Sequence, residues 1–326
     1  MQIVLDTRGL QMSVRNGCFF FKTEKETRMV HPNRVNSILV TSACRISSPA
    51  LVLASINQIP LTVCDGYGRP QARIWSPRFV NTSKLRRNQY HFTSSDSALK
   101  WASGIIGLKI KGQISNLKFL SNRKSSLAGM VNRAIAAIER QNVSYSSKII
   151  DDFYERKKQL LFTEAFAASQ YWQLIGKELH KPFQFENRIK RQPTDGFNAG
   201  INYLYGMLRN QVETAVLSIG LDPTLGIVHR DGYKMPSLVF DLMEPFRPVM
   251  DRLLLTAILE GNITDDAFQK KELALQITKT GRKQLIELFV KKLHSRILYR
   301  GSGISLNNHI LTEVKQLSNI IKTTRM

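Results

Sequence analysis

The hydrophobic pattern of the chain changes once, near residue 78, and this change limits the fold to two successive kinds of structure. Before it, short runs of β-branched and aromatic residues alternate with turn residues, as in strands joined by tight connections. After about residue 90, apolar residues recur every three or four positions, the spacing of amphipathic helices. We therefore predict an α+β protein with a small, mostly β N-terminal domain (1–78), a linker (79–92) and a larger all-α domain (93–326).

Local signals predict where some of these elements begin and end. Within the β-rich part, Ser47 or Ser48 can cap one helix that has Pro49 in its first turn. The stretch DGYGRP (65–70) predicts a hairpin connection between two strands. In the helical part, Gly220 is placed to end a long helix, because glycine readily adopts the left-handed conformation after the last turn.

The charge of the chain indicates a polyanionic ligand. Lysine and arginine total 47 against 25 acids, a formal net charge of +22. Such an excess opposes compactness and is typical of proteins that bind nucleic acid, although a basic surface can also serve solubility alone. The candidates for DNA contacts are Arg188, Lys190, Arg191 and Arg247. The first three lie in a proline-bounded stretch (182–197) that we predict to be a mobile loop ordered by DNA.

The sequence also bears on where the protein works. The first ten residues contain both an acid and a base and lack the apolar core of a signal peptide. No apolar run approaches the about 18 residues that a membrane-spanning helix needs. The three cysteines, Cys18, Cys44 and Cys64, form no CxxC pair and fit reduced thiols. We predict a soluble cytoplasmic protein.

Polar groups stand at three places where the packing pattern does not require them. Glu164 lies among small residues that permit close helix packing, and His229 follows a short apolar run after an Asp-Pro turn. Asp241 and Glu244 lie three residues apart and would project as neighbours from a helix. Each has a plainer interpretation: a solvated acid, a structural histidine, or acids at an exposed helix end.

Two prolines follow the last pair of acids closely. Pro245 and Pro248 lack the N–H groups that would bond the carbonyls of Asp241 and Glu244, so a helix must kink or restart there. Such a break lets side chains from both sides converge on an ion. Two carboxylates and one imidazole suit Mg²⁺ or Mn²⁺ better than zinc, and in a basic protein they indicate phosphodiester chemistry.

Three motifs, in order, resemble one known family over nearly the whole chain. These are TEAFAASQYW, then RIKRQPTDGFNAGINYLYGMLRNQVETAVLSIGLDPTLGIVH, then SLVFDLMEPFRPVMDRLL. They are similar to motifs of the CRISPR-associated spacer-acquisition integrases, the Cas-one family. One departure is mild: Ala165 stands where many members have glycine.

The resemblance implies a specific activity and site. It implies a metal-dependent DNA endonuclease and integrase whose metal ligands and catalytic residues are Glu164, His229 and Glu244, with Asp241 as an assisting acid. It also implies a homodimer, two of which clamp a dimer of the small partner Cas-two in a heterohexameric complex. That complex would hold a short prespacer duplex and join its 3′ ends to the CRISPR repeat by transesterification.

Two other functions remain open at this point. The chain could be an integrase of a mobile element that acts without Cas-two, or a basic DNA-binding protein without catalytic activity. The last predicts that Glu164, His229 and Glu244 can be replaced without consequence and that DNA binding does not depend on metal.

Overall fold

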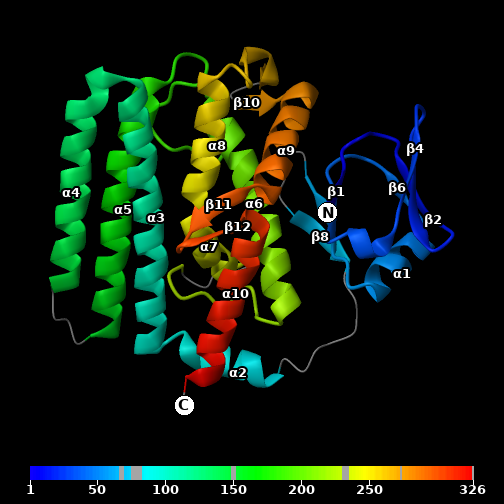
Figure 1. Ribbon diagram of the computed structural model, residues 1–326, viewed down its shortest axis with the longest axis horizontal. Helices are drawn as coiled ribbons and strands as arrows, with labels where there is room; N and C mark the ends of the chain where they lie inside the picture. Colours follow the sequence, from blue (N-terminus) through cyan, green and yellow to red (C-terminus); the bar gives the residue numbers. More distant parts are fainter. Residues whose placement is uncertain (66–69, 75–82, 148–151, 230–234, 272–273, 325–326) are drawn as a thin grey trace.

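The computed structural model describes residues 1–65, 70–74, 83–147, 152–229, 235–271 and 274–324, and of 143–147 the backbone alone. A β-rich N-terminal domain stands beside a larger helical domain (Figure 1). The predicted α+β class and the order of its two parts are therefore confirmed.

The N-terminal domain contains two four-stranded sheets. The first has the order β1-β5-β7-β8, with parallel pairing except for antiparallel β8. The second has the order β4-β3-β2-β6. Apolar side chains such as Met12, Phe19 and Leu61 form a common core. The strands are β1 (Gln2–Leu5), β2 (Gln11–Arg15), β3 (Cys18–Lys22), β4 (Thr27–Val30), β5 (Ser37–Val40), β6 (Arg45–Ile46), β7 (Leu61–Cys64) and β8 (Pro70–Ile74).

The expected helix of this domain is present as α1 (Ser48–Ile56), and the side chain of Ser47 caps it by accepting the N–H of Ala50. A short 3₁₀ turn, η1 (Pro32–Arg34), precedes β5. Strands β7 and β8 pair as the predicted hairpin, whose residues 66–69 lie outside the described residues. All three cysteines are free thiols; Cys64 is buried and the other two are half-buried.

Nine α-helices in the described residues belong to the second domain, with three 3₁₀ turns between them. The helices are α2 (Ser83–Phe92), α3 (Asp96–Arg123), α4 (Ala128–Ser147), α5 (Phe153–Glu178), α6 (Gly196–Ile219), α7 (Ser237–Met243), α8 (Arg247–Leu259), α9 (Lys279–His294) and α10 (Leu306–Thr323). The 3₁₀ turns are η2 (Ser125–Leu127), η3 (Glu244–Phe246) and η4 (Asp265–Ala267). Helix α6 ends as predicted at Gly220, which has φ of 90°.

The second domain is not all-α, because it also contains two β-hairpins. These are β9 (Phe268–Lys271) with β10 (Ala274–Ile277), and β11 (Arg296–Tyr299) with β12 (Ser302–Ser305). In the second hairpin, Arg300 and Gly301 both have positive φ, the conformation that two-residue hairpin turns require. Strand β11 was not predicted because it directly follows α9, which ends at His294, and the helical spacing of apolar residues continues into it.

The second half of the predicted linker is also helical. Residues 83–92 form α2, and its buried side chains include Leu85 and Phe92. The side-chain amide of Gln89 donates to the carbonyl of Asp222 and accepts the N–H of the same residue, at 2.8 Å in both cases. These bonds tie α2 to the turn that follows α6, so this segment belongs to the helical domain.

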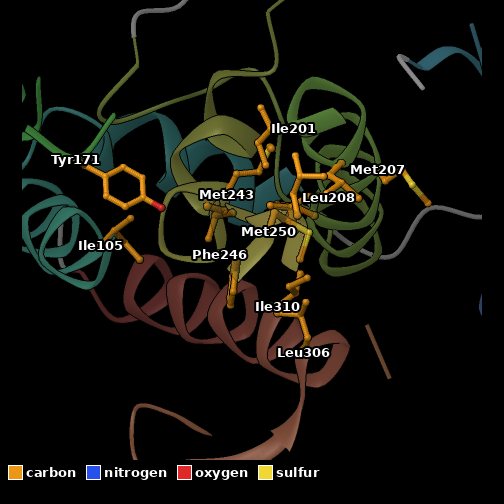
Figure 2. Packing of buried hydrophobic residues seen from close by; sticks show 14 of the residues in the cluster. Ile105, Tyr171, Ile201, Met207, Leu208, Met243, Phe246, Met250, Leu306 and Ile310 are labelled. Atoms are coloured by element: carbon orange, nitrogen blue, oxygen red, sulfur yellow. The ribbon is translucent and has the colours of Figure 1, made fainter. Parts of the chain in front are cut away.

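The core of the helical domain lies between α3, α6, α8 and α10. In Figure 2, Tyr171 and Ile105 lie at one side of the cluster, Met243, Phe246 and Met250 at its centre, and Leu306 and Ile310 on α10. Helix α3 can approach α8 closely because residue 112 is glycine: a Cβ there would lie 2.8 Å from Cβ of Pro248. No helix in the described part of the chain is both long and apolar enough to cross a membrane.

Candidate metal and nucleic-acid site

The helix break predicted around Pro245 is present and shapes the site. Helix α7 ends at Met243, one 3₁₀ turn carries Glu244, and α8 starts at Arg247. Both acids beside the break are buried: Asp241 is 0% exposed and Glu244 is 3% exposed. The plainer interpretation, acids at an exposed helix end, is therefore wrong for this pair.

Asp241 holds the segment that carries His229. One carboxylate oxygen accepts the backbone N–H groups of Ile227 and Val228, at 2.6 and 3.0 Å. The other accepts the backbone N–H of His229 at 2.9 Å and lies 2.7 Å from Nδ1 of its ring. Since a carboxylate only accepts, Nδ1 donates to Asp241, and Nε2 is the ring nitrogen left to bind an ion. Asp241 is thus an orienting acid rather than a cavity-lining one.

The second ring nitrogen of His229 lies near Glu244. Nε2 of His229 lies 3.8 Å from Oε1 of Glu244, and both side chains line one cavity of about 710 Å³. Glu164, on α5, lines the same cavity. The three residues singled out from the sequence thus come from α5, from the loop after α6 and from η3, and they meet at one cavity.

Two cations neutralise the carboxylates in this cavity. Lys109, on α3, forms ion pairs with Glu164 and, at 2.5 Å, with Oε2 of Glu244. Nε of Arg247 lies 2.9 Å from the other oxygen of Glu244. Burial alone would raise the pKa of Glu244, but Arg247 and Lys109 outweigh it and lower this pKa to about 2. Burial would likewise lower the pKa of Lys109, yet Glu244 and Glu164 hold it above its ordinary value.

The candidate DNA-contacting residues are placed unequally. Arg188, Lys190 and Arg247 line the cavity, and Lys190 is exposed. Arg191 is also exposed but does not line the cavity. A phosphate entering the cavity would therefore meet three of the four predicted cations.

The stretch predicted to be mobile is packed in its first half. Phe183 and Phe185 are buried, and the ring of Phe185 stacks on Phe197 with centroids 5.0 Å apart. Arg188 is not an unpaired charge, because its guanidinium donates to the side-chain oxygens of Asn198 and Asn202, both at 2.7 Å. Any mobility is thus restricted to the exposed part of the stretch, around 190–192.

A buried polar network forms part of the cavity wall. Asp251 accepts hydrogen bonds from the hydroxyls of Tyr205 (2.5 Å) and Tyr171 (3.1 Å). Asn116 donates to the Tyr171 hydroxyl and to the carbonyl of Pro248. Burial raises the pKa of Asp251 to about 6, although the tyrosine hydrogen bonds act in the opposite direction. The network fixes Tyr205, on whose ring Arg247 lies, 4.8 Å from its centroid.

The donor set of the cavity fits a hard divalent ion in chemistry. Two carboxylates and one oriented imidazole nitrogen are available, and Oε2 of Glu244 is buried without a well-formed hydrogen bond. Among the described residues, however, no three His, Cys, Asp or Glu side chains are already gathered as they would be around an ion. Lys109 stands between Glu164 and Glu244 instead.

The sequence reasoning missed two kinds of site residue. Lys109 was counted as an ordinary member of the amphipathic helix α3. A lysine on the apolar face of a helix nevertheless indicates a buried ion pair, since lysine is rarely buried without a partner. Arg247 was noted for DNA but not as the partner of Glu244. Nothing in the sequence predicted the hydrogen-bond network around Asp251, apart from the position of Asp251 in the third motif.

Comparison with known proteins identifies a class for this combination of fold and site. The model of the family described as CRISPR associated protein Cas1 matches residues 3–291. A relative from Archaeoglobus fulgidus, named CRISPR-associated endonuclease Cas1 1, is 28% identical over 340 residues, covering 100% of this chain and 97% of the relative. A protein of the same name from Thermodesulfovibrio yellowstonii is 31% identical over 317 residues, covering 95% and 97%.

Solved structures show the same fold. A Cas1 protein from Thermotoga maritima superposes with a TM-score of 0.81 at 19% identity, covering 100% of this chain and 98% of that one. A casposase bound to an integration product superposes with a TM-score of 0.78 at 21% identity, covering 100% of this chain and 92% of the casposase chain. A chain of a Cas6-RT-Cas1–Cas2 complex gives 0.81 at 17% identity, covering 99% of this chain and 35% of that one. The chain belongs to the Cas1 family, as its motifs had indicated.

Proposed function

We propose that this protein is a metal-dependent DNA endonuclease and integrase, which joins the 3′-hydroxyl ends of a short prespacer duplex to the CRISPR repeat. The observation that carries the proposal is the meeting of Glu164, His229 and Glu244 at one cavity of about 710 Å³, which is also lined by Arg188, Lys190 and Arg247. Membership of a family whose curated relatives are named endonucleases supports the nuclease part. The casposase bound to an integration product supports strand transfer as a use of this fold.

In this proposal the three residues would hold one Mg²⁺ or Mn²⁺ ion. Such an ion would polarise the target phosphate and stabilise charge on its oxygens. Asp241 keeps the imidazole of His229 in the tautomer that leaves Nε2 free. The surrounding cations, Arg188, Lys190 and Arg247, bind and orient phosphates of the DNA backbone.

The reaction exchanges one phosphodiester bond for another. The oxygen of a prespacer 3′-hydroxyl attacks a phosphorus atom of the repeat, a new P–O bond forms, and the bond to the 3′ oxygen of the target strand breaks. The attacking hydroxyl loses its proton and the leaving 3′ oxygen gains one, so the bonds balance without an external energy source. Water in place of the 3′-hydroxyl gives hydrolysis, the nuclease reaction.

The proposed assembly follows from the same family relationship. We propose that the chain forms a homodimer and that two dimers clamp a Cas2 dimer in the cytoplasm. The neighbour in a Cas6-RT-Cas1–Cas2 complex supports Cas2 as the partner. The casposase neighbour favours a second candidate, a mobile-element integrase that needs no Cas2. Strand transfer that is unchanged when Cas2 is omitted would favour the second candidate.

The test is strand transfer with purified protein and Cas2, a labelled prespacer and a repeat-containing plasmid, in Mn²⁺ or Mg²⁺. The Glu164→Gln variant should lose transfer by at least a hundredfold and keep its affinity for DNA. Glu186→Gln is the matched control, because Glu186 lines the same cavity but is exposed. Full transfer by Glu164→Gln would contradict the role of Glu164 in the site, and no transfer by the wild-type protein would leave a DNA-binding protein without catalysis as the better account.

A further inference from the structure

The candidate metal site already contains a cation of its own. The side chain of Lys109 is 11% exposed, and its ammonium contacts one oxygen of Glu164 and one oxygen of Glu244. Within the described residues, Lys109 is the single ion-pair partner of Glu164, whereas Glu244 is also paired with Arg247. The ammonium thus occupies the position between the two carboxylates proposed to hold the ion.

An ammonium and a divalent ion cannot share these oxygens. Lys109 contacts one oxygen of each acid and Arg247 contacts the other oxygen of Glu244, so a divalent ion bound to both acids would lie close to the ammonium and be repelled by it. Removal of the ammonium without a replacement is also unfavourable, because it leaves two carboxylates side by side and one of them buried. The ammonium and the ion therefore compete for this pair of acids.

A receptor for a displaced ammonium is present one turn along the same helix. Gln113 lies four residues after Lys109 on α3, is 2% exposed and lines the same cavity. Its side-chain oxygen is buried and has no hydrogen-bond partner in the described part of the chain. Side chains four residues apart share a helix face, and the later one leans back over the earlier. This oxygen is a free acceptor on the face of α3 that carries Lys109.

We propose that Lys109 is an exchangeable counter-ion: its ammonium keeps Glu164 and Glu244 together when no divalent ion is bound, and it moves to the side-chain oxygen of Gln113 when the ion binds. The inference rests on the proposed function, since it assumes that these carboxylates bind metal. It makes Lys109 a positioning residue that sets metal affinity.

A purely structural role for Lys109 makes the opposite prediction for metal affinity. A lysine that only braces α3 against α5 and η3 aligns the ligands, so its loss would weaken metal binding. An exchangeable counter-ion competes with the ion, so its loss strengthens metal binding. The sign of the change in affinity separates the two roles.

The test is calorimetric titration of Mn²⁺ into the full chain at pH 8. We expect Lys109→Met, which keeps the length but not the charge, to bind Mn²⁺ at least tenfold more tightly than wild type. Without metal it should melt at a lower temperature, and saturating Mn²⁺ should close the difference. Lys111→Met is the matched control, since Lys111 is exposed on the same helix. Equal or weaker binding by Lys109→Met would overturn the inference alone, whereas no Mn²⁺ binding by either protein would overturn the proposed metal site and this inference with it.

Gln113 gives a second, independent measurement. Gln113→Met should weaken Mn²⁺ binding several-fold in the wild-type background and have no effect in the Lys109→Met background, because no ammonium then needs an acceptor. Additive effects of the two substitutions would contradict the proposed movement.

Discussion

The carboxylate of Asp241 and the imidazole of His229 form a unit in which the acid is fully buried and the ring faces the cavity. Nδ1 of the ring lies 2.7 Å from Oδ1 of the acid, and the same carboxylate accepts three backbone N–H groups from the segment that ends at His229. Asp241 therefore fixes both the position of the backbone and the tautomer of the ring. This pairing separates the two acids near the helix break into an orienting acid and a candidate ligand, Glu244.

The first prediction concerns Asp241→Asn. The side chain of Asn has one N–H₂ group in place of a carboxylate oxygen, so it cannot accept from all of the backbone N–H groups and the ring Nδ1 that Asp241 binds. The His229 ring therefore loses its fixed tautomer. Mn²⁺ affinity should fall 10- to 100-fold, the usual effect of losing such a partner. Calorimetric titration measures it. Asp222→Asn is the control, because Asp222 lies in the same loop and bonds to Thr224 instead. An unchanged affinity for Asp241→Asn would show that the carboxylate does not orient the ring.

The second prediction uses the raised pKa of Asp251, about 6 instead of 3.8. The folded state holds this proton more tightly than the unfolded state, so the stabilisation is complete below about pH 4 and is lost as the pH rises through about 6. The rise in pKa corresponds to about 3 kcal/mol. Asn does not titrate, so the free energy of unfolding of wild type minus that of Asp251→Asn should fall by about this amount between pH 4 and pH 7.

Urea unfolding at pH 4, 5, 6 and 7 measures this difference. Asp265→Asn is the control, because Asp265 is exposed, and its difference from wild type should change much less with pH. A difference for Asp251→Asn that stays constant or grows with pH would show that Asp251 is ionised throughout this range.

The third prediction concerns the salt dependence of DNA binding. With a net charge of +22, affinity should fall steeply with salt, by about 0.9 in the slope of log affinity against log salt for each phosphate contact. Lys190→Ala should reduce the slope by about that amount, because Lys190 is exposed at the cavity. Fluorescence anisotropy from 50 to 300 mM salt measures it. A nearly flat dependence in wild type would contradict electrostatic binding.

The fourth prediction concerns hydrogen exchange in the stretch 182–197. The N–H groups of Phe183 and Gly196 donate to backbone carbonyls, and that of Ile189 donates to Asn198, so these amides should be protected in the free protein. Amides at 190–192 should exchange quickly and slow down when a short duplex is added. No change at 190–192 would mean that this exposed segment is not a DNA contact.

The sequence predicted the parts of this protein that depend on local periodicity and on punctuating residues. The change near residue 78, the glycine after α6 and the helix break at Pro245 each follow from backbone preferences of single residues or short patterns. The strands β11 and β12 were missed because a two-residue turn at Arg300 and Gly301 carries a weak sequence signal. Helix α2 was missed because the bonds of Gln89 to Asp222 connect residues 133 positions apart.

The sequence was enough to predict which acids and which histidine form the site, but not which cations pair with them. Glu164, His229 and Glu244 were named from motif context, and the structure brings them to one cavity. Lys109 and Lys111 are two residues apart on one helix, and although Lys109 lies on the apolar face, the sequence does not indicate which acids it pairs with. That choice depends on how α3 packs against η3 and α5. Arg188 was expected to be unpaired. Its partners Asn198 and Asn202 lie in the next helix, α6, and the sequence alone does not show that they fold back onto Arg188.

The central claim, that Glu164, His229 and Glu244 hold one divalent ion, is tested most directly by a crystal of the protein grown with Mn²⁺. Anomalous scattering at the manganese edge locates the ion without reference to any assumed site. We predict one peak per chain at coordination distance from Nε2 of His229 and from carboxylate oxygens of Glu164 and Glu244, with the ammonium of Lys109 no longer between the acids. A peak elsewhere in the chain, or no peak with Lys109 still paired to both acids at saturating Mn²⁺, would contradict the claim.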